Sequence, residues 1–466
     1  MKKQTNRSSF SGQLGFIMAA AGSAVGLGNI WRFPYLAAKD GGGIFIFCYI
    51  ILALTFGFSL LTTEVAIGRK TKQSPLTAYG KINRRWKGIG VLACLVPILI
   101  LPYYCSIGGW VFKYLAIYLT NQGAEAAAEE YFSGYISGTF QPLIYMLIFF
   151  GITAVIVYRG VEKGIERYSK ILMPILVVMI VGISLFSLTL EHTEPNGTVR
   201  TGLEGLKVYL VPNFSEISIK EFFIILMDAM GQLFFSISVA MGIMVAYGSY
   251  VRKDTNLMHS INQIEFFDTL IALLAGLMIV PAVFTFMGAN GMSTGPGLIF
   301  VSLPKVFTAM GSIGNIIGFT FFLIVSFAAV TSSVSVMEAI VSSIMDHFGF
   351  SRKKSTVIVS VYTLIIGCVV CLGYNSLFFK LTLPNGTVGQ ILDVLDYISN
   401  NCLMPLVALL TCVLIGWVVK PDVIIEEVTQ GKYKFRRKWL YIIMIKFIAP
   451  IMLFLLLLQS AGLFNS

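Results

Sequence analysis

Long apolar stretches separated by short polar loops occupy most of the chain. Because about 20 apolar residues cross a bilayer as a helix, we predict eleven spans, at about 13–37, 42–67, 88–120, 141–158, 168–190, 220–248, 261–288, 313–346, 355–374, 388–418 and 439–464. Of the 466 residues, 56% are hydrophobic and only 12% are charged, a composition outside the range of soluble globular proteins. The predicted fold class is therefore an all-α polytopic membrane protein.

Basic side chains gather in alternate loops, so the net charge of +11 reflects membrane topology and does not indicate nucleic-acid binding. The positive-inside rule then predicts a plasma-membrane protein with a cytoplasmic N-terminus. Residues 1–25 also resemble a signal peptide. Cleavage there would cut a segment that continues to Pro34, so we favour an uncleaved first span. The basic clusters begin at Lys2, Lys70, Arg159, Arg252, Arg352 and Lys432.

The first span contains residues that disfavour a continuous helix, namely Gly22, Gly26, Gly28 and Asn29. Each interior glycine costs about 1 kcal/mol relative to alanine. Backbone groups freed at membrane depth must line a cavity or find a partner. Broken helices in transporters use such groups to bind ions and small polar substrates.

A second interruption lies in the sixth span, between Gln232 and Gly242. The two breaks are five spans apart, and this odd offset predicts an inverted repeat in which Gly26 and Ser238 meet near the midplane. Ordinary glycine packing between membrane helices is the alternative interpretation. We predict one domain over 1–466, with a first repeat at about 10–190, a second at about 219–418 and an extra helix at about 439–464.

Several motifs together resemble the neurotransmitter:sodium symporter family and its bacterial amino-acid transporter branch. The resemblance implies ten core helices in a 5+5 inverted repeat, with helices 1 and 6 broken. It covers nearly the whole chain. The motifs are Gly22 to Pro34, Gly41-Gly42-Gly43, Tyr103-Tyr104, Gln232 to Gly242, Thr331-Ser332-Ser333 and Asp393 to Asp396.

The resemblance implies two sodium sites. One would use the carbonyls of Ala24 and Ser236 with the side chains of Asn29, Ser236 and Asp268. The other would use the carbonyls of Gly22, Val25 and Ala328 with the hydroxyls of Thr331 and Ser332. Neutral oxygen ligands suit a hard monovalent cation, which supports both assignments.

The same break predicts the substrate. Freed N–H groups near Leu27 and Gly28 attract an anionic group, which in the family is an amino-acid carboxylate that also contacts sodium. Family members that carry amines have an aspartate where this chain has Gly26, so an α-amino acid is expected. The predicted substrate residues, with Tyr104 as hydroxyl donor and Phe235 as lid, are Ala24, Gly26, Leu27, Gly28, Ile100, Tyr104, Phe235, Ser236, Ser238, Met241, Ser332 and Val336.

Charged residues inside the spans are expensive and mark function. The resemblance pairs Arg32 with Asp396 as an extracellular gate. It places Arg7, Asp346 and Tyr250 in a cytoplasmic gate, beside which Phe10 replaces the usual tryptophan. We expect Glu64 to accept from exposed backbone at the sixth-span break. Asp228 and Glu338 receive no role from the sequence.

Asp268 stands where many family members have asparagine, and Ala272 replaces a serine that helps hold chloride in animal members. A buried carboxylate beside sodium can supply the fixed negative charge. We therefore expect no chloride requirement. When the transporter returns without sodium and substrate, a protonated Asp268 would carry a proton back across the membrane.

These patterns predict a sodium-coupled symporter of neutral, hydrophobic or aromatic L-amino acids that works by alternating access in the lipid bilayer. An uncoupled carrier or a transporter-like sensor is the alternative. An intramembrane enzyme is disfavoured, because the spans show no pairing of a nucleophile with a base. The oligomeric state stays open.

Overall fold

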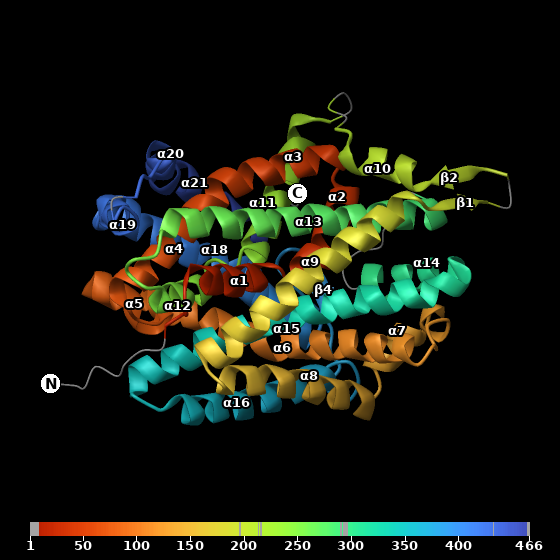
Figure 1. The fold of residues 1–466 in the computed structure, drawn as a ribbon, viewed down its shortest axis with the longest axis horizontal. Helices are drawn as coiled ribbons and strands as arrows, with labels where there is room; N and C mark the ends of the chain where they lie inside the picture. The colour runs from red at the N-terminus through yellow and green to blue at the C-terminus, as the bar shows by residue number, and fades with distance from the viewer. Residues whose placement is uncertain are drawn as a thin grey trace.

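The computed structural model describes residues 9–194, 197–212, 214, 217–288, 291, 297–431 and 433–463. The long helices run side by side along the long axis of Figure 1. One end of the molecule carries α5 (Pro75–Ile82) and α19 (Asp422–Val428). The other end carries α7 (Tyr131–Ile136), α10 (Gly202–Leu210) and the hairpin of β1 (Glu191–Thr193) and β2 (Val199–Thr201).

Within the described residues, nine helices are long and apolar enough to cross a membrane, and one bent pair makes a tenth span. The bent pair comprises Gln13–Ala24 and Gly28–Lys39, at 50° to each other. The predicted sixth span is split into two shorter helices, Ile219–Ser236 and Ile243–Tyr250, and is not among these ten. The all-α polytopic fold is thus confirmed. The nine helices are Gly43–Thr71, Arg84–Leu119, Phe140–Tyr158, Val161–Leu188, Leu257–Met287, Gly311–Phe348, Arg352–Leu372, Ile391–Val418 and Lys438–Ser460.

The individual α-helices are shorter than the spans, because π-helical turns interrupt many of them. In the first half of the chain they are α1 (Gln13–Ala24), α2 (Phe33–Lys39), α3 (Gly43–Leu52), α4 (Phe58–Thr71), α6 (Lys87–Leu119), α8 (Phe140–Tyr158) and α9 (Arg167–Leu188). In the second half they are α11 (Ile219–Ser236), α12 (Ile243–Tyr250), α13 (Leu257–Met287), α14 (Leu303–Ala309), α15 (Gly314–Phe348), α16 (Arg352–Leu372), α17 (Ile391–Asp396), α18 (Met404–Val413), α20 (Lys438–Ile443) and α21 (Ala449–Ser460).

The π-helical turns lie at Gly28–Arg32, Ala53–Gly57, Val161–Glu166, Leu298–Ser302, Tyr397–Leu403, Leu414–Val418 and Met444–Ile448. Such turns are frequent where a helix is adapted for function. Short 3₁₀ turns occur at Arg84–Trp86, Glu125–Ala127 and Gly311–Ile313. A second small hairpin pairs β3 (Leu381–Thr382) with β4 (Val388–Gly389).

Packing of α4 against α12 depends on two glycines. A Cβ atom on Gly68 would lie 2.1 Å from the carbonyl oxygen of Val245, and one on Gly248 would lie 2.3 Å from that of Val65. The two backbones therefore touch directly. This close approach fixes α12, the part of the chain that follows the second break, against α4.

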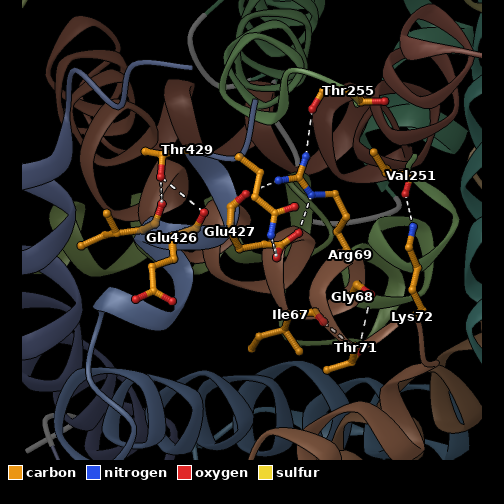
Figure 2. Close-up of polar contacts among 12 residues, drawn as sticks. Ile67, Gly68, Arg69, Thr71, Lys72, Val251, Thr255, Glu426, Glu427 and Thr429 are labelled. Atoms are coloured by element: carbon orange, nitrogen blue, oxygen red, sulfur yellow. Dashed lines mark hydrogen bonds and ion pairs between the residues drawn. The ribbon is translucent and has the colours of Figure 1, made fainter. Parts of the chain in front are cut away.

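A buried ion pair ties the end of α4 to two other segments (Figure 2). Arg69 Nε donates to Glu427 Oε1 at 2.7 Å, and its Nη1 donates to the carbonyl of Thr255 at 2.8 Å. Its Nη2 donates to the Glu427 carbonyl. The Arg69 side chain is fully buried and that of Glu427 is 4% exposed. The guanidinium thus joins α4, the loop after α12 and α19.

Candidate functional site

The break in the first span begins where Val25 leaves the helix, with φ −76° and ψ 90°. The break between α11 and α12 contains Ser238 and Ala240 in the left-handed region, with φ of 56° and 62°. These conformations interrupt the helical hydrogen bonds and free backbone groups. The two breaks face each other, because Ser238 Oγ donates to the carbonyl of Ser23 at 3.1 Å.

Side chains from other helices satisfy part of the freed backbone. Glu64 Oε1 accepts from the N–H of Ala240 at 2.7 Å, which is the role expected of it. Gln232 Nε2 donates to the carbonyl of Gly28 at 2.9 Å. Each break therefore has a polar side chain that bonds one of its freed backbone groups, as backbone N–H and C=O groups buried in a membrane require.

A pocket lies between the two breaks. Every predicted substrate residue except Ser236 lines it, and Ser23 and Asn29 join them. The lining residues are Ser23, Ala24, Gly26, Leu27, Gly28, Asn29, Ile100, Tyr104, Phe235, Ser238, Met241, Ser332 and Val336. Residues from four separate segments of the chain thus form one pocket.

Two glycines let side chains close around the backbone in this pocket. A Cβ atom on Gly26 would lie 2.6 Å from Ser332 Oγ, and one on Gly28 would lie 2.3 Å from Phe235 Cδ1. The N–H of Leu27 donates to the hydroxyl of Tyr104 at 3.4 Å. The pocket therefore has a polar end made of bare backbone and one tyrosine hydroxyl.

The side chains predicted for the first sodium site gather beside this pocket. Asn29 Nδ2 donates to Ser236 Oγ and to Asp268 Oδ1, both at 2.9 Å. Ser236 Oγ donates to the same carboxylate oxygen. All three residues are at most 1% exposed. The cluster offers a carboxylate, an amide and a hydroxyl, an oxygen-bearing set that fits a hard cation.

Tyr49 belongs to this cluster and was missed by the sequence analysis. Its hydroxyl donates to Asp268 Oδ2 at 3.2 Å and lies 3.1 Å from Ser236 Oγ. The only signal was a tyrosine within an apolar span, and a buried tyrosine hydroxyl usually has a polar partner. Nothing in the sequence shows that this partner is 219 residues away.

The residues predicted for the second sodium site lie where α1 meets α15. Ser332 Oγ donates to the carbonyl of Ser23 at 3.0 Å and lies 3.4 Å from that of Val25. Thr331 Oγ1 donates to the Ala328 carbonyl at 3.1 Å. A Cβ on Gly22 would lie 3.4 Å from Thr331 Cβ. Carbonyl and hydroxyl oxygens therefore gather here without a carboxylate among them.

Of the two predicted extracellular gate residues, Asp396 has polar partners of its own. Asp396 Oδ1 accepts from Tyr103 at 3.0 Å and from Asn400 at 2.6 Å. Arg32 Nη2 lies 3.6 Å from the position of a Cβ on Gly231. Among the described residues, the ion pairs do not include one between Arg32 and Asp396. The charge of Arg32 still acts on Asp396, so the two residues are neighbours without direct contact, and their role as a gate stays a prediction.

Near the predicted cytoplasmic gate, Glu338 on α15 joins α12 and α16. It accepts from Tyr250 at 2.6 Å and from both Nη atoms of Arg352, at 2.6 and 2.8 Å. Asp346 accepts from the N–H of Ser74 at 2.6 Å. Arg7, the third predicted member of this gate, lies outside the described residues. Glu338 thus acquires a partner set that its sequence neighbours did not indicate.

Phe10 fills the space beside this gate. It is 2% exposed and packs edge-on against Tyr247 and Tyr250, with ring centroids 5.7 and 6.2 Å away. Its N–H donates to the Tyr250 carbonyl at 3.2 Å. Phe10 therefore fills the place of the usual tryptophan by aromatic packing against two tyrosines.

Two broken helices that cross around a buried polar pocket, within a bundle of membrane-spanning helices, define a secondary transporter. The model of the Sodium:neurotransmitter symporter family matches residues 7–133 and 133–466, and the chain belongs to this family. The protein is a multi-pass, sodium-dependent membrane transporter. The family consists of transporters and not of enzymes.

Relatives align over nearly the full length. The chain is 33% identical to the sodium-dependent transporter YhdH of Bacillus subtilis, covering 98% of each chain. It is 32% identical to the sodium-dependent transporter MJ1319 of Methanocaldococcus jannaschii, covering 94% of this chain and 87% of the relative. The crystal structure of MhsT in complex with L-phenylalanine superimposes with a TM-score of 0.85 at 34% identity, covering 98% of this chain and 100% of that one.

Proposed function

We propose that this protein is a sodium-coupled symporter of neutral, hydrophobic or aromatic L-amino acids. It works by alternating access in the plasma membrane, with its N-terminus in the cytoplasm. The observation that carries the proposal is the pocket between the two breaks, which has a backbone-lined polar end and an apolar wall. An amino acid with an apolar side chain fits such a pocket, because its carboxylate needs hydrogen-bond donors and its side chain needs apolar contacts.

The polar end suits a carboxylate. The N–H of Leu27 and the hydroxyl of Tyr104 are 3.4 Å apart and both border the pocket. Gly26 leaves no side chain between them, and an aspartate at this position would meet Ser332. An amine without a carboxylate would offer these donors no charged acceptor, whereas a buried hydrogen bond to a charged group contributes about 1.5–3 kcal/mol.

The remaining wall suits an uncharged side chain. Ile100, Phe235, Met241 and Val336 contribute apolar surface, and the pocket lining includes no acidic or basic residue. A charged substrate side chain would therefore be desolvated without a partner. The solved complex of MhsT with L-phenylalanine, a protein with the same fold, supports this substrate class.

Two sodium ions would accompany the substrate. The first would be held beside Asn29, Ser236 and Asp268, close enough to the pocket to share the substrate carboxylate. The second would be held between α1 and α15 by Thr331, Ser332 and carbonyls of Gly22, Val25 and Ala328. The Asp268 carboxylate would supply the negative charge beside the first ion, so that chloride is not needed.

Uptake of labelled L-phenylalanine into proteoliposomes tests the coupling. An inward sodium gradient should drive accumulation, and an equal potassium gradient should not. Thr331→Ala should weaken sodium affinity by about 1–3 kcal/mol, the cost of losing a buried polar partner. Thr320→Ala is the matched control, since Thr320 also bonds within α15 but lies outside the site. Equal accumulation in both salts would favour the uncoupled carrier, and sodium-dependent binding without uptake would favour the sensor.

A further inference from the structure

Asp40, at the C-terminus of α2, is an acidic residue that neither sodium site uses. Its side chain is 5% exposed. Oδ1 lies 3.5 Å from Lys39 Nζ, whereas the buried Oδ2 has no hydrogen-bond partner among the described residues. An ionised carboxylate oxygen left unpaired in this way is costly, so the environment favours a bound proton.

A second carboxylate shares the same ammonium group. Lys39 Nζ lies 2.8 Å from Asp228 Oδ2 on α11. With both acids ionised, the two carboxylates and the ammonium carry a net charge of −1. Protonation of one acid makes the cluster neutral. The other groups in its field are Tyr35 on α2 and, beyond it, Arg32.

The cluster joins the two half-helices that lie beyond the breaks. Lys39 and Asp40 end α2, the outer part of the first broken helix, and Asp228 lies within α11, the corresponding part of the second. Lys39 to Asp228 is therefore a polar bridge between the moving halves of a broken-helix transporter. A change in the net charge of the cluster therefore strengthens or weakens the contact between α2 and α11.

We infer that Asp40, Asp228 and Lys39 form a proton-binding site that holds α2 against α11. The inference rests on the proposed orientation, in which this site faces the extracellular medium. Protonation of Asp40 removes the repulsion between the two carboxylates and the penalty of the unpaired oxygen. Acid outside the cell would thus hold the two half-helices together, and alkali would loosen them.

The direction of the effect follows from linkage. Burial and then the neighbouring Asp228 carboxylate raise the pKa of Asp40 to about 7, against the opposing influence of Lys39. An exposed aspartate titrates near pH 4. Between about pH 4 and 7 the packed arrangement therefore binds the extra proton. As the pH rises through this window, the packed arrangement loses stability. The equilibrium constant that favours it over the arrangement with an exposed Asp40 should fall by up to about tenfold per pH unit.

Thermal unfolding of the purified full-length protein in sodium buffer tests the site without requiring transport. Asp40→Asn should raise the Tm at about pH 8.5, where the native carboxylate is ionised, and leave it unchanged at about pH 4, where the carboxyl is protonated in the folded protein and the window has not begun. Glu129→Gln is the control: it removes an 86% exposed acid that pairs with Lys305 and should shift neither value. An Asp40→Asn effect that is equal at both pH values would overturn the inference.

Infrared difference spectroscopy of the protonated carboxyl band gives an independent measurement. One wild-type band that is lost with a midpoint near neutral pH should be missing from Asp40→Asn, while the bands of the other buried carboxyls stay. Asp228→Asn should move the midpoint of this band to lower pH, and Lys39→Gln should move it to higher pH. A complete set of wild-type bands in Asp40→Asn, or a midpoint that neither neighbouring substitution moves, would refute the assignment. Failure of sodium-driven uptake, in contrast, would refute only the proposed transport function.

Discussion

Replacement of Asp268 by asparagine is the sharpest test of the first sodium site. The Asp268 carboxylate accepts from three side chains, namely Asn29, Tyr49 and Ser236. Asparagine has the same shape but carries no charge, and its amide nitrogen cannot accept. At least one of these donors would therefore lose its acceptor inside a fully buried cluster.

The magnitude follows from these contacts. A buried hydrogen bond to a charged group contributes about 1.5–3 kcal/mol, which corresponds to about a 10- to 150-fold change in a dissociation constant. We expect the sodium Kd of Asp268→Asn to rise by this factor. Added chloride should recover part of the loss, because a mobile anion beside Tyr49 and Ser236 would replace the missing charge.

Sodium titration of L-phenylalanine binding, in chloride and in gluconate, measures both effects. Glu265→Gln is the matched control, since Glu265 lies one turn earlier on α13 and pairs with Arg437 instead. Because Glu265 is the weakest of the influences on Asp268, its replacement should change the sodium Kd far less than Asp268→Asn does. Chloride dependence of the wild type, or an unaltered sodium Kd in Asp268→Asn in gluconate, would refute the reasoning.

Three further changes test the pocket and its support. Met241→Phe should penalise tryptophan and tyrosine more than alanine or valine in competition uptake, because a flexible side chain is replaced by a rigid ring; equal weakening would argue against this wall. Gly28→Ala places a Cβ 2.3 Å from Phe235 and should abolish L-phenylalanine binding in calorimetry, whereas Gly182→Ala, with open space around it, should not. Arg69→Gln leaves a buried carboxylate unpaired and should lower stability by about 3–5 kcal/mol, seen as a lower Tm; an unchanged Tm would contradict the role of this ion pair.

The pattern along the chain was enough to predict the membrane spans and both breaks. The cost of burying polar backbone in a bilayer is local, so glycines and an asparagine within an apolar run reveal an interruption wherever they occur. The motif from Gly22 to Pro34 therefore indicated a broken helix, which the structure confirms. Glu64 also bonds the second break as expected, because an acid inside a span needs a nearby donor.

Only the tertiary structure decided which partners the buried polar groups find. Tyr49 reaches Asp268, Asp228 reaches Lys39, and Glu338 reaches Arg352. The first two pairs are separated by 219 and 189 residues. Sequence patterns record the need for a partner, since burial without one is costly. They do not record its identity, because that depends on which helices pack together and at which height in the membrane.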